Sequence, residues 1–340
     1  MTPSSLLNPP QTDLKATDLP TRPESTLARH PFESAPFLES WWEHLAPKFC
    51  GGEGEGQLFK TTKPVLKGLV PLQFLRQAGW NGVYYQSLNQ ADWESFRTLS
   101  DRTRWDCFEV RWNQTVTDSQ VFNPYLRLGC KVLHTPVSGS PVIELQNGWE
   151  AYWQAKGSHH RQNINRQFKK AAHLQPELIF FEGEQGLAEF FARFFPAHQA
   201  YWQSKGEGSY FEDPRERAFI ISWASKLQQS GQLCLSGLLL GGQITNLSFN
   251  VIHRNVLYAL LTINTGVHHQ AVPGIMALHQ LTQHACAQGM ETIDLGPGES
   301  TFKKKFATRV DPCFQTLIIN PKSVAGQLYG AFKSGKSVSV

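Results

Sequence analysis

The stretch LCLSGLLLGGQITNLSFNVIHRNVLYALLTIN, which runs from residue 233 to residue 264, carries the strongest structural signal in this chain. Two dipeptides that favour tight turns, Gly-Gly and Arg-Asn, divide it into three apolar runs: Leu233–Leu240, Gln243–His253 and Val256–Asn264. Apolar runs joined by two-residue turns are typical of β-hairpins. The stretch is therefore predicted to form three consecutive antiparallel strands.

Helix signals lie on both sides of these strands. One helix is predicted from Pro214 to Gln229, because proline is favoured at the first helical position. Another is predicted to begin at Pro273 and to end before Gly289. Hydrophobic periodicity predicts the other elements of this half: helices at 149–153, 158–173 and 186–205, and strands at 178–181 and 292–295.

The amino-terminal half has a weaker pattern of α/β (α+β) type, with helices predicted at 37–45 and 92–99 and strands at 57–59, 68–74, 107–111 and 142–145. With 340 residues, of which 41% are hydrophobic, the chain is large enough for two domains. We expect four segments: a flexible leader at 1–29, an amino-terminal domain at 30–147, a carboxy-terminal domain at 148–322 and a loose tail at 323–340.

Composition narrows the classes of function. The net charge of +4 is too small to indicate a nucleic-acid or membrane partner by itself. The six cysteines are widely scattered, without a C-x-x-C pair, and are expected to be reduced thiols. No apolar run approaches the roughly 18 residues of a membrane span, and the first residues lack a secretory or transit pattern. A cytoplasmic protein is therefore expected.

Four blocks of the carboxy-terminal half carry a resemblance to a known family: SHHRQNINRQFKKAAH (158–173), HQAYWQSKGEGSYFEDPRERAF (198–219), AVPGIMALHQLTQHACAQG (271–289) and DLGPGESTFKKKF (294–306). In this order they resemble Gcn5-related N-acetyltransferases (GNAT). Specifically, they resemble the GNAT-like acetyltransferases of cellulose and exopolysaccharide biosynthesis, which are related to the Fem peptidyltransferases. The resemblance implies tandem GNAT-like domains with a mixed central sheet flanked by helices, the amino-terminal domain being degenerate.

The resemblance also implies acyl-CoA as a co-substrate. In a GNAT fold the pantetheine arm lies beside one strand, here 256–264, and N–H groups at the start of the next helix hold the pyrophosphate. The sequence departs from the usual phosphate signature Q/R-x-x-G-x-G/A, because Pro273 replaces its first glycine and lacks an N–H group. The candidate donor contacts are His268, His269, Gln270 and Gly274. A metal is not expected at the two histidines, because no other ligand has a supporting spacing.

A carboxylate at the exit of the strand 292–295 is placed to remove the proton of an attacking amine or hydroxyl. Glu299 is the first candidate for this general base, and Asp294 is the second. The structural alternatives are that Asp294 orders the Gly-Pro-Gly turn and that Glu299 pairs with Lys303. The resemblance implies that Lys303 contacts a phosphate or a polar acceptor, whereas the alternative is a solvated run of lysines.

Aromatic and basic side chains are candidates for acceptor binding. Tyr201, Trp202 and Tyr210 could form a wall for a sugar or an acyl chain, although Trp202 fits a helix core equally well. Arg161 lies on a basic helix face with Arg166, Lys169 and Lys170. This face is either solvated or binds an anionic acceptor or RNA.

The combined expectation is an acyltransferase. It would move an acyl group, acetyl in the first instance, from acyl-CoA to an amine or hydroxyl of a sugar or envelope-polysaccharide precursor. Direct attack in a ternary complex is expected, because no G-x-S-x-G or Cys-His signature supports a covalent intermediate. The alternatives are a Fem-like transferase that uses aminoacyl-tRNA, the only case in which a nucleic-acid partner is expected, and a non-catalytic GNAT-like scaffold.

Overall fold

The computed structural model describes residues 30–49, 54–65, 68–80, 82, 84–88, 90–114, 119–334 and 338–339. The leader expected at 1–29 lies outside the described residues. Across these ranges, no helix combines the length and the apolar character needed to cross a membrane.

Strands and helices are mixed along the chain. The strands are β1 (Gly54–Glu55), β2 (Leu58–Val65), β3 (Val70–Gln77), β4 (Cys107–Asn113), β5 (Lys131–Glu144), β6 (Glu177–Phe180), β7 (Leu233–Leu240), β8 (Gln243–His253), β9 (Val256–Asn264), β10 (Thr292–Asp294), β11 (Arg309–Ile319) and β12 (Val338–Ser339). The α-helices are α1 (Ala35–His44), α2 (Ala46–Phe49), α3 (Gln90–Arg102), α4 (Asn123–Arg127), α5 (Gly148–Ala155), α6 (Ser158–Ala171), α7 (Gly183–Ser204), α8 (Pro214–Gln229), α9 (Pro273–Ala287), α10 (Thr301–Phe306) and α11 (Val324–Ser334). Short 3-10 helices include η6 (Tyr210–Glu212) and η7 (His269–Ala271).

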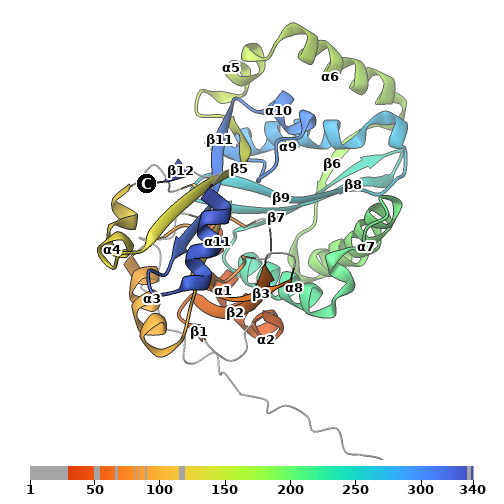
Figure 1. Cartoon of the computed structure of the whole chain (residues 1–340). Coiled ribbons are helices and arrows are strands. Elements are labelled where there is room, and N and C mark those ends of the chain that lie inside the picture. The colour runs from red at the N-terminus through yellow and green to blue at the C-terminus, as the bar shows by residue number, and fades with distance from the viewer. Residues whose placement is uncertain are drawn as a thin grey trace, which may run out of the picture.

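The strands form one mixed sheet with the order β1-β2-β3-β4-β11-β5-β10-β9-β8-β7-β6, and β12 pairs with β5 beside this path. Helices cover both faces of the sheet (Figure 1). The predicted meander is present with the predicted bounds, as β7, β8 and β9. The structure thus confirms the predicted mixed α/β fold with a central sheet flanked by helices.

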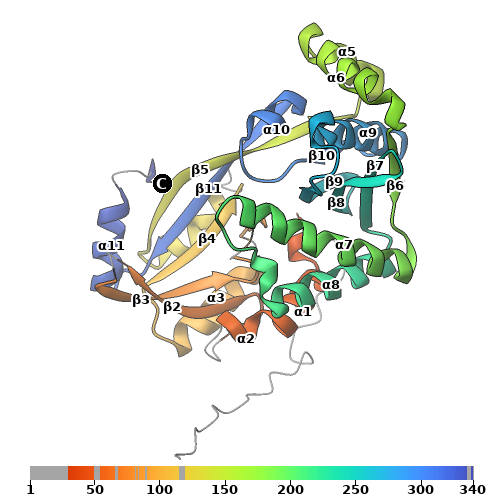
Figure 2. The same cartoon turned by 90° about the vertical axis from the view of Figure 1, so that its right-hand side faces the viewer.

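The two ends of the sheet repeat one arrangement. In the amino-terminal half β3 and β4 are parallel neighbours joined through α3, and in the carboxy-terminal half β9 and β10 are parallel neighbours joined through α9. Each half then gives a long strand to the other, because β5 pairs with β10 and β11 pairs with β4. β5 and β11 also pair with each other and form the seam between the halves (Figure 2). The segments expected to meet at residues 147 and 322 therefore contribute strands to one continuous sheet.

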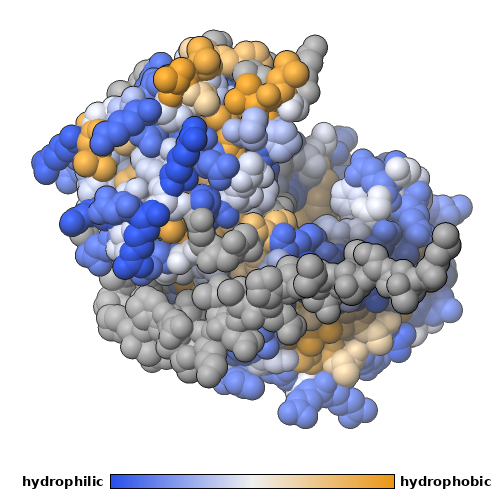
Figure 3. Space-filling model, turned by 60° about the horizontal axis from the view of Figure 1, so that its bottom comes forward, coloured by the Kyte–Doolittle hydropathy of each residue, from blue (hydrophilic) through white to orange (hydrophobic). Residues whose placement is uncertain are grey.

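Helices of both halves share one core. Helix α1 packs on α8, and Ser40 lies 3.1 Å from Ser222 between their hydroxyl oxygens. Phe37 of α1 and Trp223 of α8 are both fully buried, with ring centroids 5.1 Å apart. The opposite face of the carboxy-terminal strands carries α5, α6, α9 and α10. In the space-filling view, hydrophobic surface gathers in separate patches, one of them inside a hollow (Figure 3).

Several elements differ from the expectation, and two of them bear on the central sheet. β5 begins at Lys131 instead of near residue 142, because Pro136, Gly139 and Pro141 interrupt its apolar pattern and are typical of a loop. The pairing of β5 with β11 shifts register next to Pro136, which accommodates this residue within the sheet. The tail expected to be loose from residue 323 instead forms α11, which packs on the sheet through Ala325 and Tyr329.

Candidate functional site

Strands β9 and β10 part soon after they meet. Their parallel pairing ends where Asp294 lies opposite Tyr258. The chain after Asp294 turns towards β5, where the N–H of Leu295 donates to the carbonyl of Pro141 at 3.0 Å. Within the described part of the chain, β9 therefore has no strand partner on this edge beyond the pairing with Asp294. Backbone N–H groups along such an edge can bind an extended ligand as a neighbouring strand would.

A β-bulge lies at the start of this open edge. On the other side of β9, Phe249 pairs with Leu261 while the next residue, Asn250, pairs with Ala259. Leu260 is thus the extra residue of the bulge. Because a bulge reorients local backbone groups and increases strand twist, it helps to separate β9 from β10.

Asp294 lies where the two strands part and holds three hydrogen bonds on one oxygen. Its Oδ1 accepts from the Tyr85 hydroxyl at 2.7 Å, from the Ser140 hydroxyl at 2.8 Å and from the N–H of Gly296 at 2.8 Å. Tyr85 and Ser140 also contact each other through their hydroxyls. Asp294 is the second of the two predicted carboxylates, and its hydrogen-bond partners come from both halves of the chain.

Burial dominates the charge properties of this cluster. It raises the pKa of the Asp294 carboxyl above its ordinary value, although the three donors oppose the shift. Burial, followed by the nearby Asp294 charge, raises the pKa of Tyr85 well above its ordinary value, so this hydroxyl keeps its proton at neutral pH. A carboxylate with a raised pKa beside proton-bearing hydroxyls is suited to proton transfer.

Two more aromatic side chains adjoin the cluster. The Tyr258 hydroxyl lies 3.4 Å from Nδ1 of His30, and the His30 ring lies 5.0 Å from that of Tyr85 between centroids. No sequence pattern marked His30, Tyr85, Ser140 or Tyr258. Ser140 lies in SGSP, which is typical of a loop, and the two tyrosines follow no spacing that relates them to residue 294.

Glu299 lies in the turn beyond Asp294 and is held by two groups. One oxygen, Oε1, accepts from the N–H of Gly139 at 2.8 Å, and Oε2 lies 2.6 Å from Nζ of Lys304. The Lys304 hydrogen bond, followed by the Gly139 N–H, lowers the pKa of Glu299. The alternative partner expected for Glu299 was Lys303, whereas its observed partner is Lys304.

Lys303 instead closes the Gly-Pro-Gly turn. Its Nζ donates to the carbonyls of Gly296 and Pro297, each at 3.2 Å. Burial lowers the pKa of Lys303, and the Asp294 charge opposes this shift. Asp294 and Lys303 therefore hold the backbone of Gly296 on both sides, Asp294 through the N–H and Lys303 through the carbonyl.

The predicted donor residues gather at the other end of β9. His268, His269 and Gln270 lie in and before η7, and Gly274 lies in the first turn of α9. A Cβ at Gly274 would lie 3.4 Å from the side-chain oxygen of Asn264, the last residue of β9. At about 3.3 Å per residue, β9 places this group roughly 20 Å from Asp294. The open edge of β9 therefore connects the donor group with the carboxylate cluster.

The backbone before α9 is strained. Val272 has φ 53° and ψ 56°, a left-handed conformation that a β-branched residue rarely adopts. Pro273 follows it, and a proline restricts the preceding residue to extended conformations. Such strain persists where the surrounding structure imposes it, and it is commonly found at ligand-binding loops.

Tyr201, Trp202 and Tyr210 form a separate aromatic group around His198. The Trp202 indole N–H donates to His198 Nε2 at 3.0 Å, and the Tyr210 ring lies 5.1 Å from the histidine ring. Burial lowers the pKa of His198 to about 4, so the ring is neutral and Nδ1 donates to the Ser209 hydroxyl at 2.8 Å. Tyr201 and Tyr210 are about half exposed and are available to a ligand.

Arg161 lies apart from these groups, on α6. It donates to the Gln154 carbonyl and side chain, both at 2.9 Å, and so fixes α6 to α5. The other basic residues of α6 expose their side chains: Arg166, Lys169 and Lys170. Helix α6 also contacts η7, which carries His269, one of the residues predicted to contact the acyl donor.

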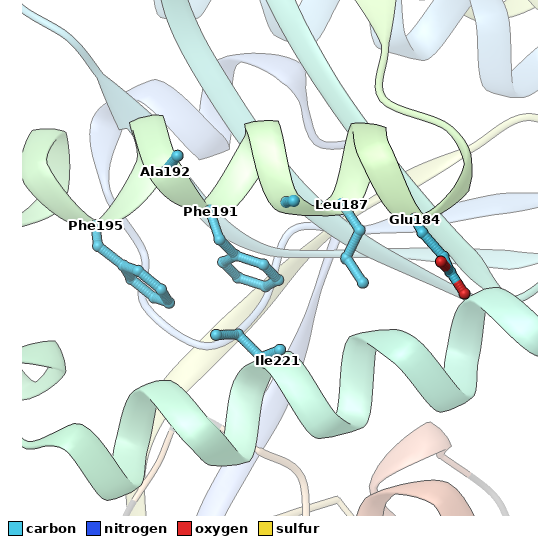
Figure 4. Close-up of a pocket in the computed structure, with 7 residues that line it drawn as sticks. Glu184, Leu187, Phe191, Ala192, Phe195 and Ile221 are labelled. Atoms are coloured by element: carbon cyan, nitrogen blue, oxygen red, sulfur yellow. The ribbon is translucent and has the colours of Figure 1, made fainter.

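A surface groove of about 390 Å³ lies between α7 and α8 (Figure 4). Leu187, Phe191 and Phe195 of α7 face Ile221 of α8 across it, and Glu184 lies at one end. The lining includes none of the residues predicted to bind or react. Within the ranges that the structure describes, no three His, Cys, Asp or Glu residues are grouped so as to hold a metal ion.

Comparisons with known proteins agree with this architecture. Residues 158–304 match the family model of the acetyltransferase (GNAT) domain, and no curated protein matches the chain. FemX has the same fold, with 11% identity, a TM-score of 0.54, and coverage of 90% of this chain and 96% of FemX. L-PGS from Bacillus licheniformis is also similar, with 11% identity, a TM-score of 0.51 and coverage of 89% and 98%.

A third similar structure is the C-terminal domain (DUF2156) of a protein described as a lysylphosphatidylglycerol synthetase of Agrobacterium fabrum. It has 12% identity, a TM-score of 0.51 and coverage of 83% of this chain and 91% of that domain. At these identities the likeness shows the fold alone. The comparisons thus show a match of residues 158–304 to the GNAT acetyltransferase domain and a fold shared with these structures, and they do not extend to the acceptor.

Proposed function

We propose that this protein transfers an acyl group, acetyl in the first instance, from acyl-CoA to an amine or hydroxyl of a sugar or envelope-polysaccharide precursor. The observation that carries the proposal is the open edge of β9, which begins beside the Asp294 cluster and ends beside α9. A GNAT domain over residues 158–304 supports the reaction class.

The donor supplies an activated carbonyl carbon. The unpartnered N–H groups of β9 would orient its pantetheine arm, and those near the Leu260 bulge would stabilise the oxyanion. The N–H of Gly274 and the side chains of His268, His269 and Gln270 are the groups we assign to the pyrophosphate. The acceptor contacts are assigned to the aromatic side chains Tyr201, Trp202 and Tyr210. Arg161, on α6, remains a further candidate for acceptor binding.

We assign the general-base role to Asp294 ahead of Glu299. The nucleophile forms its bond to the carbonyl carbon while its proton passes through the Tyr85 or Ser140 hydroxyl to Asp294, the C–S bond breaks, and the departing thiolate takes up a proton. The ion pair with Lys304 lowers the basicity of Glu299, whereas burial raises that of Asp294. Lys303 acts by holding the turn that positions Asp294.

The test has two stages. First, CoA, acetyl-CoA and longer acyl-CoAs are screened by thermal shift, because a ligand that binds only the folded state raises Tm. Second, the variants Asp294→Asn and Glu299→Gln are compared in a thiol-release assay with a panel of amino sugars. Asp294→Asn is expected to lower kcat by about 10²–10⁴-fold, and Glu299→Gln by less than about fivefold. The reverse result would return the role to Glu299, and the absence of any donor shift would contradict acyl-CoA use.

The second candidate is a Fem-like transfer from aminoacyl-tRNA. It is favoured by the exposed basic side chains of α6 and by the contact of this helix with η7 beside the donor site. Binding of tRNA should then weaken steeply with salt. Lys169→Gln with Lys170→Gln should weaken tRNA binding while leaving any acyl-CoA thermal shift unchanged. If the protein is instead a non-catalytic scaffold, Asp294→Asn should leave its function in cells unchanged.

A further inference from the structure

Helix α11 is apolar on two opposite faces. Its inner face packs on the sheet, where Ala325 and Tyr329 join a cluster that includes Leu72 and Leu317. Gly326 allows a close approach, because a Cβ there would lie 2.6 Å from the carbonyl oxygen of Asp106. The outer face consists of Val324, Leu328 and Phe332, whose exposed fractions are 76%, 64% and 69%.

The three outer residues form one continuous stripe. They are spaced by four positions, and residues at this spacing lie on the same side of an α-helix. A helix that is apolar on all sides is normally buried on all sides. Leu69, on the turn between β2 and the α11-contacting strand β3, adds another exposed apolar side chain, with 81% exposed. The outer face of α11 therefore has the apolar composition that is typical of a surface in contact with a partner.

Among the residues that the structure describes, the exposed charges around this stripe are positive. Lys322 precedes α11 and is exposed, whereas Lys333 in the last turn is partly buried and lies over the Tyr329 ring. Lys131 pairs with Ile319, and Lys63 pairs with Leu72. Since both partners belong to the cluster beneath α11, the two lysines lie on the face of the sheet that carries α11.

The acidic residues near the stripe are buried and satisfied. Asp106 accepts a hydrogen bond from Ser323, and Glu109 is ion-paired with Arg76 at 2.8 Å. Helix α11 itself contains no acidic residue. The surface that surrounds the stripe therefore complements a negatively charged partner.

We propose that α11 docks this protein on the surface of an anionic lipid bilayer. Val324, Leu328 and Phe332 insert among the lipids at the interface, while Lys63, Lys131 and Lys322 lie among the head groups. The small size of the patch favours a bilayer over a second copy of the chain, because a stable protein interface takes roughly 20–30 residues from each side. Binding is weak and reversible, since one short apolar stripe supplies it. The inference does not depend on the proposed transfer reaction.

The first experiment is flotation of the full-length protein with vesicles. One set contains phosphatidylcholine alone, and the other contains equal parts of phosphatidylcholine and phosphatidylglycerol. The protein is expected to float with the anionic vesicles and to be released by high salt. Leu328→Ser is expected to weaken binding by roughly tenfold or more. Ile221→Ser, at an exposed aliphatic side chain of α8, is the control and should leave binding unchanged.

The second experiment tests the charges. Lys131→Gln and Lys322→Gln are each expected to weaken binding by roughly fivefold, whereas Lys170→Gln on α6 should have no effect. Circular dichroism melting confirms that each variant is folded. The proposal would be overturned if the wild-type protein floated with neither kind of vesicle. It would also be overturned if Leu328→Ser floated as well as the wild type. A concentration-dependent dimer that Leu328→Ser abolishes would overturn it too, because α11 would then be a subunit interface.

Discussion

Tyr85 donates a 2.7 Å hydrogen bond to Asp294, although the two residues are 209 positions apart in the chain. Tyr85 precedes α3 in the amino-terminal half, and Asp294 ends β10 in the carboxy-terminal half. Ser140, the second hydroxyl on the carboxylate, lies on β5, the strand that the amino-terminal half gives to the other half. The candidate site therefore belongs to both halves. A GNAT domain cut from this chain would lose two of the three donors that hold Asp294.

Replacement of Tyr85 by Phe removes one of those donors and keeps the ring. Hydrogen bonds to charged groups contribute about 1.5–3 kcal/mol, so kcat/KM is expected to fall by roughly ten- to a hundredfold. The pKa of Asp294 should rise further, because the lost hydrogen bond favoured the charged form. The acidic limb of the pH–rate profile should consequently move to higher pH.

Tyr84→Phe is the control for this substitution. The Tyr84 ring is buried against Phe37, Phe219 and Trp223, away from the carboxylate. Removal of the Tyr84 hydroxyl should leave the acidic limb of the pH–rate profile in place. An unchanged limb in Tyr85→Phe would mean that Asp294 is not the titrating base.

Asp294 should also lower the stability of the folded protein at neutral pH. Its folded-state pKa lies above the ordinary value of 3.8, so the folded state binds its proton more tightly than the unfolded state does. The free energy of unfolding therefore falls as pH rises from 3.8 through the raised pKa. Asp294→Asn should melt at a higher temperature than the wild type at pH 7, and the difference should shrink at pH values below 3.8. Glu299→Gln should not behave in this way, because the pKa of Glu299 is lowered.

Local sequence patterns predicted most of the elements but not their assembly. The meander had clear turn dipeptides and apolar runs, so the bounds of β7, β8 and β9 were predicted correctly. β5 was predicted only at its end, because prolines and a glycine interrupt it and its neighbours β10 and β11 come from the other half. The exchange of β5 and β11 depends on pairing between segments far apart in the chain. Hydrophobic periodicity within a short stretch of sequence carries no information about such pairing.

The same limit applies to the candidate site. Asp294 and Glu299 could be named as candidates because they follow an apolar run in a glycine-rich turn, where carboxylates commonly act. Tyr85 and Ser140 were missed, since only the exchanged strand brings them to Asp294. The sequence ranked Glu299 ahead of Asp294 for the general base, and this ranking took no account of burial or the Lys304 ion pair, which shift the two pKa values in opposite directions.

Two adjacent lysines should differ sharply in their effect on activity. Lys303 donates to two carbonyls of the turn beside Asp294, whereas Lys304 is half exposed and pairs with Glu299. Lys303→Met is expected to lower kcat/KM by roughly tenfold or more, because charged donors to the backbone contribute about 1.5–3 kcal/mol. Lys304→Met should cost at most about 1 kcal/mol of stability, as exposed ion pairs do. Equal losses of kcat/KM in the two variants would indicate that the overall positive charge matters, and not the turn that Lys303 holds.

Strain at Val272 can be tested by relieving it. A β-branched residue in the left-handed region costs about 1–3 kcal/mol, and glycine adopts this region without steric cost. Val272→Gly is therefore expected to raise the free energy of unfolding, measured in urea, by roughly 1 kcal/mol after the entropic cost of glycine is subtracted. Val267→Gly in the same loop is the control, because Val267 does not have a positive φ. It should lower stability by about 0.5–1 kcal/mol.

The same variant separates a functional strain from an incidental one. If the left-handed Val272 holds His268, His269 and Gly274 in position for the pyrophosphate, Val272→Gly should raise the Kd for CoA even as it stabilises the fold. Titration of CoA by calorimetry measures this directly. A stabilised variant with an unchanged Kd would show that the strain serves only chain geometry, and the assignment of the donor site to this loop would lose its support from Val272.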